Sequence, residues 1–371
     1  MNLDWRNSRE EYLWLGALVA LSVLGFGIAA LAGSLAGLPA WRIAFFYMKV
    51  IWILGPAALM FIAAPIVLRA LVLHLRNPFA RLMQYLRDRF GSPALAAGTL
   101  LPILVLPLLM GSFGTLKMLL PLARPFEWDD WLAAADRILF FGYQPWQFTH
   151  AVFGSPTLTQ GIDYAYSLWV ALLFTAVLFY SLLAQRYDRA RFFIAFGAAW
   201  LLIGVAGAYF FASAGPCYAA LVGAQSAPEF APLMEKLKAM HEGGARLEAY
   251  KWQSVLWQHH AAQRYGFAMG ISAMPSMHNA ITVLYALSLA GAARPVRLAA
   301  WGFVALIFIG SIHLGWHYAV DGIAAGLMMW GIWVAAGAFL DRVSYARALR
   351  AGDGQDSEPS LPEFAPKPVA I

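Results

Sequence analysis

Residues 93–114 read PALAAGTLLPILVLPLLMGSFG, a run of 22 residues without a charged side chain. A helix needs about 20 consecutive apolar residues to cross the hydrocarbon core of a bilayer. A surface helix of a soluble domain, by contrast, is apolar on one face only. The stretch therefore predicts a helix that spans a membrane.

Seven further segments have the same character. With the first, they cover about 13–33, 44–68, 93–114, 158–184, 192–213, 277–293, 299–315 and 318–340. The chain of 371 residues is 61% hydrophobic and 12% charged, whereas about a quarter of the residues are charged in an ordinary soluble domain. This composition excludes a soluble globular protein, a coiled coil and a disordered chain. The sequence predicts an all-α polytopic membrane protein with about eight transmembrane helices.

The first span, 13–33, is expected to remain in the protein. It follows Glu10 and Glu11 instead of a basic stretch, and it is long for the apolar part of a signal peptide. The single cysteine, Cys217, excludes an intrachain disulfide. From about residue 351 onward the chain has no apolar periodicity, and a disordered tail is expected there.

Positive charges are concentrated in alternate connections, and this pattern predicts the orientation. Sixteen of the 26 Lys and Arg residues follow it: Arg6, Arg9, Arg69, Arg76, Arg81, Arg87, Arg89, Arg186, Arg189, Arg191, Arg294, Arg297, Arg342, Arg347, Arg350 and Lys367. Cytoplasmic loops are rich in Lys and Arg. Both termini are therefore predicted to be cytoplasmic, and the short loops favour a bacterial plasma membrane.

The other long connections, about 115–157 and 214–276, then face the outer side. Within them, segment 126–148 predicts an amphipathic piece at the membrane interface, with a solvated acidic face that includes Asp129, Asp130 and Asp136. Segment 227–264 predicts two short helices broken at Gly243–Gly244, either a structural cap or a substrate lid. All histidines except His74 lie at or near this side, so we expect the chemistry there.

Two clusters on the outer side have the residue types that hold a phosphate. Lys117 and Arg124 follow the third span, and PSMH at 275–278 opens the sixth. Pro275 and Ser276 suit the first turn of a helix, where free amides and the dipole favour an anion near the Ser276 hydroxyl and the His278 imidazole. Lys117 and Arg124 would add the positive charge that phosphoryl transfer requires.

The third cluster, HYAVD at 317–321, supplies a candidate nucleophile. On a helix, His317 and Asp321 would share a face, since they are four residues apart. The carboxylate would fix the tautomer of the imidazole and leave its other nitrogen free to attack. Together, the three clusters predict phosphoryl transfer through a phosphohistidine.

The motifs Lys-x6-Arg-Pro, Pro-Ser-x-His and His-x3-Asp, in this order, resemble those of the type 2 phosphatidic acid phosphatase superfamily of membrane phosphatases and phosphotransferases. The resemblance covers about residues 93–340. It implies three parts: a two-span extension with a basic cytoplasmic loop over 1–92, a six-span core over 93–340, and a cytoplasmic tail over 341–371.

The resemblance also implies roles for the site residues. His317 would accept the phosphate, and Asp321 would orient the His317 imidazole. His278 would be the general acid for the leaving alcohol. The groups that would hold the phosphate are Lys117, Arg124 and Ser276. The mechanism needs no cofactor and no metal.

One departure from the family pattern points to a branch. The family usually has an arginine six residues before the nucleophile, where this chain has Ser311. Losing that cation weakens the binding of a doubly charged phosphomonoester more than that of a phosphodiester. The segments SAMPSMH at 272–278 and HYAVD at 317–321 are similar to the inositolphosphotransferase-like branch, which includes inositol phosphorylceramide synthases. We therefore favour headgroup transfer, although Arg246, Lys251 or Arg264 could replace the missing cation.

Alternatives remain at this stage. Within the same chemistry, the protein would be a plain phosphatase acting on phosphatidate or a polyprenyl pyrophosphate. In another class, it would be a transporter or channel, with an ion flux that depends on Asp163 or Asp321. His313 would contact the substrate or be structural, and an unbroken helix through Gly315 would let His313, His317 and Asp321 bind a metal. Lys117 and Arg124 could simply extend to the interface.

The expected partners are a lipid phosphate or phospholipid substrate and the bilayer itself. No nucleic acid is expected, because the basic residues alternate with spans and form no patch. The sequence makes no prediction about the oligomeric state.

Overall fold

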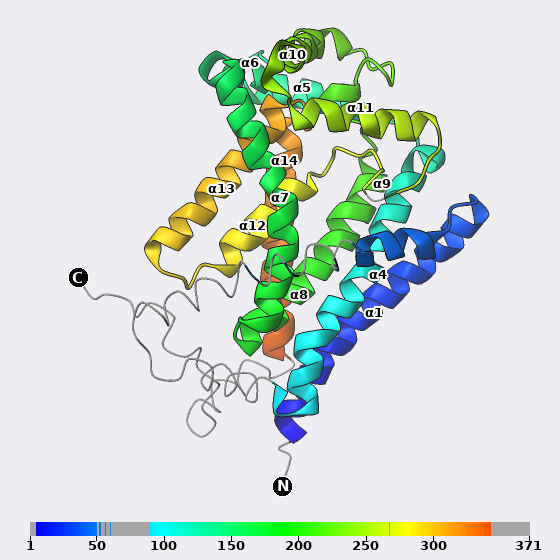
Figure 1. Ribbon diagram of the computed structural model, residues 1–371, viewed down its shortest axis with the longest axis vertical. Helices are drawn as coiled ribbons and strands as arrows, with labels where there is room; N and C mark the ends of the chain where they lie inside the picture. The colour runs from blue at the N-terminus through cyan, green and yellow to red at the C-terminus, as the bar shows by residue number, and fades with distance from the viewer. Residues whose placement is uncertain are drawn as a thin grey trace.

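The structure, a computed structural model, describes residues 5–49, 52, 56, 60, 90–266 and 268–342. Within these ranges every regular element is a helix (Figure 1), which confirms the all-α prediction. The elements are α1 Trp5–Leu35, α4 Pro93–Ala123, α5 Asp129–Leu139, α6 Pro145–Phe153, α7 Pro156–Leu182, α8 Arg186–Leu201, η1 Leu202–Gly207, α9 Ala208–Phe210, η2 Pro216–Tyr218, α10 Ala227–Met240, η3 His241–Ala245, α11 Glu248–Ala261, α12 Met277–Ser288, α13 Arg294–His313 and α14 Ala319–Arg342. Residues 40–49 are also helical.

Six helices in the described part of the chain are long and apolar enough to cross a membrane. They are Glu11–Leu35, Pro93–Ala123, Pro156–Leu182, Arg186–Phe210, Arg294–His313 and Ala319–Arg342. Each coincides with a predicted span. Of the two remaining predictions, the span at 277–293 corresponds to α12, which has 12 residues, and most of the span at 44–68 lies outside the described residues. The protein is an integral membrane protein.

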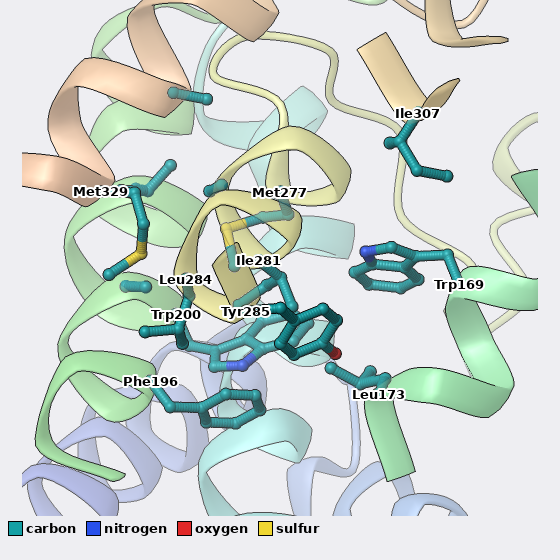
Figure 2. Close-up of a cluster of buried hydrophobic side chains, with 14 of the residues drawn as sticks. Trp169, Leu173, Phe196, Trp200, Met277, Ile281, Leu284, Tyr285, Ile307 and Met329 are labelled. Atoms are coloured by element: carbon teal, nitrogen blue, oxygen red, sulfur yellow. The ribbon is translucent and has the colours of Figure 1, made fainter. Parts of the chain in front are cut away.

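The short helix α12 lies at the centre of the bundle. Figure 2 shows its residues Met277, Ile281, Leu284 and Tyr285 in one buried cluster with side chains from α7, α8, α13 and α14. Ile281 and Leu284 are fully buried. A helix that is apolar around most of its circumference has to be enclosed. The first turn of α12, which begins after Ser276, is thereby held among the longer helices.

The span that contains α8 changes its winding close to the start of α12. Residues Leu202–Gly207 form a π-helical turn between α8 and α9. A Cβ atom on Gly207 would lie 2.9 Å from the ring of Pro275, and one on Gly204 would lie 2.9 Å from the Phe113 ring. Glycine at these positions allows the backbone to pass against Pro275, which leads into α12, and against the Phe113 ring of α4.

The N-terminal extension packs along α4. A Cβ atom on Gly111 would lie within 2.6 Å of Ala44, so residues 40–49 and α4 meet backbone to backbone. Near the start of α1, the buried carboxylate of Glu11 forms ion pairs with Arg189, at 2.5 Å, and with Arg186, at 3.4 Å. These contacts join the extension to α8 at the lower end of the bundle in Figure 1.

At the opposite end, the helices α5, α6, α10 and α11 lie across the bundle, and we call them the cap (Figure 1). The two predicted short helices over 227–264 correspond to α10 and α11, with a break at Gly244, where φ is 106°. Phe230, Leu233 and Leu237, on α10 of the cap, are buried. The predicted amphipathic piece over 126–148 forms α5 and the start of α6.

Two further predictions fall on parts of the chain outside the described residues. The basic loop with Arg69, Arg76, Arg81, Arg87 and Arg89 is one, and the tail beyond residue 342 is the other. The boundaries at residues 92 and 340 remain predictions.

Candidate active site

His317 and Asp321 meet where α13 passes into α14. The helix α13 ends at His313, and Gly315 reverses the backbone with a φ of 74°. His317 lies in this turn, and Asp321 lies in the first turn of α14. The His317 Nδ1 and the Asp321 Oδ2 are 3.3 Å apart, so the predicted pair forms although the two residues do not share one helix.

Asp321 also helps to begin α14. Its Oδ2 accepts the backbone N–H of Tyr318 at 3.1 Å, as the third residue of a helix does in a capping box. Its Oδ1 is buried and has no hydrogen-bond partner in the described part of the chain. Burial and the nearby positive charge of Lys117 lower the pKa of His317. The His317 imidazole is therefore neutral at pH 7, the form in which it can act as a nucleophile.

His278 faces this pair from the first turn of α12. The ring centres of His278 and His317 are 6.0 Å apart. On its other side, His278 stacks on Tyr166 at 4.9 Å and lies 4.2 Å from the ring of Trp169, both from α7. The Tyr166 Oη and the Trp169 Nε1 are buried without a hydrogen-bond partner among the described residues. The sequence analysis missed this aromatic pair, although its spacing of three residues is a helical-face signal.

Ser276 is the N-cap of α12. Its Oγ accepts the backbone N–H of Asn279 at 3.4 Å and the Asn279 Nδ2 at 3.0 Å. The same Nδ2 reaches the Ser311 Oγ of α13 at 3.3 Å, and the backbone N–H of Ser276 donates to the carbonyl oxygen of Asp321 at 3.4 Å. Asn279, which the sequence analysis did not single out, thus links α12, which carries His278, to the end of α13, just before the turn that contains His317.

Lys117 reaches the same region from α4. Its Nζ lies 5.5 Å above the ring of Phe113. The residue is in close contact with Gly270, because a Cβ atom there would lie 2.7 Å from the Lys117 Cγ. Its positive charge acts on His317. Lys117, Ser276, His278, His317 and Asp321 are therefore brought together from three segments that are far apart in the chain.

Arg124 lies elsewhere. It is the C-cap residue of α4, and its guanidinium donates to the carbonyl oxygen of Tyr209 at 3.3 Å and pairs with Glu127 at 3.6 Å. Its side chain is 43% exposed. The contacts of Arg124 are with Tyr209 of α9 and with Glu127 before α5, not with the two histidines.

His313 belongs to a separate cluster under the cap. It stacks on His150 of α6 with ring centres 3.9 Å apart. Its Nε2 and Nδ1 contact the hydroxyls of Thr159 and Thr149 at 2.9 and 3.2 Å. The break at Gly315 separates it from His317. The alternative of a metal held by His313, His317 and Asp321 is wrong, because it required an unbroken helix.

Two carboxylates of α5 are buried, and the prediction of a solvated acidic face was wrong for them. Asp129 and Asp136 are each 1% exposed. Asp129 accepts the N–H groups of Ala214 and Gly215, both at 2.8 Å, and the Tyr318 hydroxyl at 3.0 Å. Asp136 accepts two N–H groups at the start of α14. The partners lie far away in the sequence, so a local charge pattern could not reveal them.

Comparison with known proteins supports the same region. The sequence model of one protein family, the PAP2 superfamily, matches residues 130–335. This range is more than half of the chain. The match includes Ser276, His278, His317 and Asp321, whereas Lys117 and Arg124 precede it. No curated protein and no solved structure matches the chain. Because this match covers more than half of the chain, the chain belongs to the PAP2 superfamily of membrane phosphatases. This membership supports a function of the lipid-phosphatase type.

Proposed function

We propose that the protein is a lipid phosphatase or phosphotransferase that forms a phosphohistidine on His317. The observation that supports this most directly is the arrangement of three groups. The His317 imidazole is 3.3 Å from Asp321 on one side, faces His278 at 6.0 Å between ring centres, and lies in the field of the Lys117 charge. This set contains a neutral nucleophile, its orienting carboxylate, an acid–base group and a cation.

In the first step, the free nitrogen of His317 attacks the phosphorus of the substrate. The new N–P bond forms as the bond between phosphorus and the leaving oxygen breaks, and His278 gives a proton to that oxygen. Burial, His317 and Lys117 lower the pKa of His278 in the substrate-free protein, so this proton has to be taken up together with the anionic substrate. In the second step, water or an alcohol gives a proton to His278 and attacks the phosphorus. The N–P bond then breaks and His317 is regenerated.

Lys117 and the start of α12 would stabilise the charge on the phosphoryl oxygens. We keep Arg124 as a candidate phosphate ligand that would have to exchange Glu127 for substrate. Contact between His313 and the substrate has less support, since both nitrogens of its ring already have threonine partners.

We favour headgroup transfer from a phosphodiester, as in the inositolphosphotransferase-like branch. Ser311, at the position of the usual arginine, is fully buried and bonded to Phe308 and Asn279. Of the cations that could replace it, Lys251 pairs with Glu248 at 3.1 Å. Arg264 instead lines a cavity of about 30 Å³ that also includes Gly270, the residue against Lys117. If Arg264 supplies the missing charge, plain phosphatase activity becomes the better hypothesis.

The cap end of the bundle would face the outer side of the membrane, with both termini in the cytoplasm. The support is the distribution of basic residues in the sequence. The transporter alternative used Asp163 as part of an ion path. Its carboxylate accepts two backbone N–H groups at the start of α11, which gives it a structural role instead.

The test compares purified wild type with His317→Ala and His278→Ala in detergent. Labelled phosphatidate, a polyprenyl pyrophosphate, and phosphatidylinositol with ceramide are the substrates, and every labelled product is resolved. We expect background activity for His317→Ala and a loss of about 10²–10⁴-fold for His278→Ala, the usual contribution of general acid–base catalysis. His241→Ala, in the cap beside Tyr250, is the control and should retain activity.

The products decide between the two reactions. A new headgroup-bearing lipid from wild type alone supports the transferase, whereas free phosphate without an acceptor supports the phosphatase. Wild-type turnover by His317→Ala would exclude the phosphohistidine mechanism.

A further inference from the structure

The residues that follow His317 are bonded to a helix more than 180 positions earlier in the chain. The Asp136 carboxylate of α5 accepts the backbone N–H of Ala319 at 2.7 Å and that of Val320 at 2.9 Å. These are the first two residues of α14. Together with the bond from the Tyr318 N–H to Asp321 at 3.1 Å, three consecutive N–H groups at this helix start are bonded to two carboxylates.

The first N–H groups of a helix have no partner within the helix. At α14 they do not remain available for a substrate phosphate, because Asp136 and Asp321 already occupy them. The phosphate site at a helix start is instead expected at α12. The acidic groups at α14 set the direction of the first turn, and that turn determines where Asp321 lies relative to His317.

The other side of the turn is also held from outside. Asp129, at the start of α5, accepts the Tyr318 hydroxyl at 3.0 Å and the N–H groups of Ala214 and Gly215. The segment after Gly215 contacts the turn directly, because the Cys217 N–H donates to the carbonyl oxygen of Gly315 at 2.9 Å. The backbone before His317 and the backbone after it are therefore both fixed by buried hydrogen bonds.

We propose that Asp136 is a positioning residue of the reaction, which holds the His317–Asp321 pair in its reactive geometry through the amides of Ala319 and Val320. Asp129 supports the same turn through Tyr318. This inference rests on the proposed function of His317 as nucleophile. A displacement of about 1 Å in a reacting group can lower a rate by about 10²-fold, so a bond that fixes the backbone beside the nucleophile affects turnover more than binding.

The chain offers a matched control on the same helix. Asp130 also accepts two consecutive backbone N–H groups, but these belong to Gln225 and Ser226, just before α10, at 3.1 and 2.8 Å. Asp130→Asn and Asp136→Asn thus remove the same kind of bond from α5. Only the second affects the turn that contains His317.

The experiment measures kcat, KM and the thermal midpoint of wild type and both variants, with the lipid substrate that wild type turns over best. In Asp136→Asn, the N–H of either Ala319 or Val320 must face the side-chain NH2 group, which cannot accept a hydrogen bond. We expect kcat to fall by about 10–100-fold while KM stays within about twofold. Asp130→Asn should keep the wild-type kcat and KM.

The inference is overturned if Asp136→Asn keeps the wild-type kcat, or if both variants lose kcat in proportion to their thermal midpoints, as a purely structural role would give. Wild type that is inactive on every lipid phosphate would contradict the proposed function itself, and this inference with it. If Asp136→Asn does not yield folded protein, Tyr318→Phe decides. This variant loses only the hydroxyl bond to Asp129, and an unchanged kcat would count against positioning by α5.

Discussion

The two ends of the bundle hold their buried carboxylates in different ways. In the cap end, Asp129, Asp136 and Asp163 each accept two consecutive backbone N–H groups from another segment. At the opposite end, the fully buried Glu11 is paired with the side chains of Arg189 and Arg186.

The difference follows from what each bond has to fix. A side-chain ion pair joins two helices but leaves each backbone free to begin and end where its own sequence dictates. A carboxylate on two amides fixes the backbone itself, and it brings no cation close to the candidate site. The first arrangement therefore suits the attachment of α1 to α8, and the second suits loops and helix starts around the candidate site.

The largest effect is expected at the opposite end. Arg189→Met would leave the buried Glu11 carboxylate without its closest cation, and loss of one partner of a buried ion pair costs about 3–5 kcal/mol. The free energy of unfolding, measured by denaturant titration in mixed micelles, should fall by that amount. The double variant Glu11→Gln with Arg189→Met should recover part of the loss. An effect below about 1 kcal/mol for the single variant would mean that the pair does not hold α1 to α8.

The next effect concerns pH. Burial raises the pKa of Asp136 from 3.8 to about 7, against the lowering effect of its two amide bonds, and the nearby Asp321 also raises it. The folded state thus binds the proton more tightly than the unfolded state. This contribution to stability is fully present below about pH 4 and is lost as the pH rises through about 7.

Comparison of wild type with Asp136→Asn isolates this contribution. Between pH 5 and pH 7 the stability of wild type relative to the variant should fall by up to about 2 kcal/mol, since one pH unit corresponds to about 1.4 kcal/mol. Thermal midpoints measured at both pH values provide the test. For Asp130, burial raises the pKa but its amide bonds and Arg137 lower it by more, so that the pKa lies below 3.8. Its contribution to stability is lost only as the pH falls below about 4, so wild type and Asp130→Asn should show no such trend between pH 5 and pH 7. A difference between wild type and Asp136→Asn that does not change with pH would contradict the prediction.

The smallest effect is expected at α11. Asp163→Ala removes the cap of this helix start, which typically costs about 1 kcal/mol. Amide hydrogen exchange should increase at Glu248 and Ala249, while the rest of the bundle stays protected. Glu242→Gln, which breaks an exposed pair with Lys238 at 3.9 Å, is the control and should change stability by less than about 0.5 kcal/mol. Equal exchange in both variants would mean that Asp163 does not cap α11.

The prediction from sequence was strongest where the signal is local. Long apolar runs gave the spans, and the motif spacing gave the pairing of His317 with Asp321. It was weaker where a residue acts through a partner distant in the chain. Arg124 donates to the carbonyl oxygen of Tyr209, His313 packs on His150, and Asp129 and Asp136 are buried rather than solvated.

The sequence by itself determined that this is a helical membrane protein and which residues have the chemistry for phosphoryl transfer. Both follow from apolar run length and from side-chain type, which do not depend on distant contacts. Only the tertiary structure decided which of these residues meet, because α4, α12 and the turn before α14 are connected by long segments of chain. It also decided the role of α5, whose carboxylates are bonded to backbone N–H groups, and every residue type except proline offers such a group.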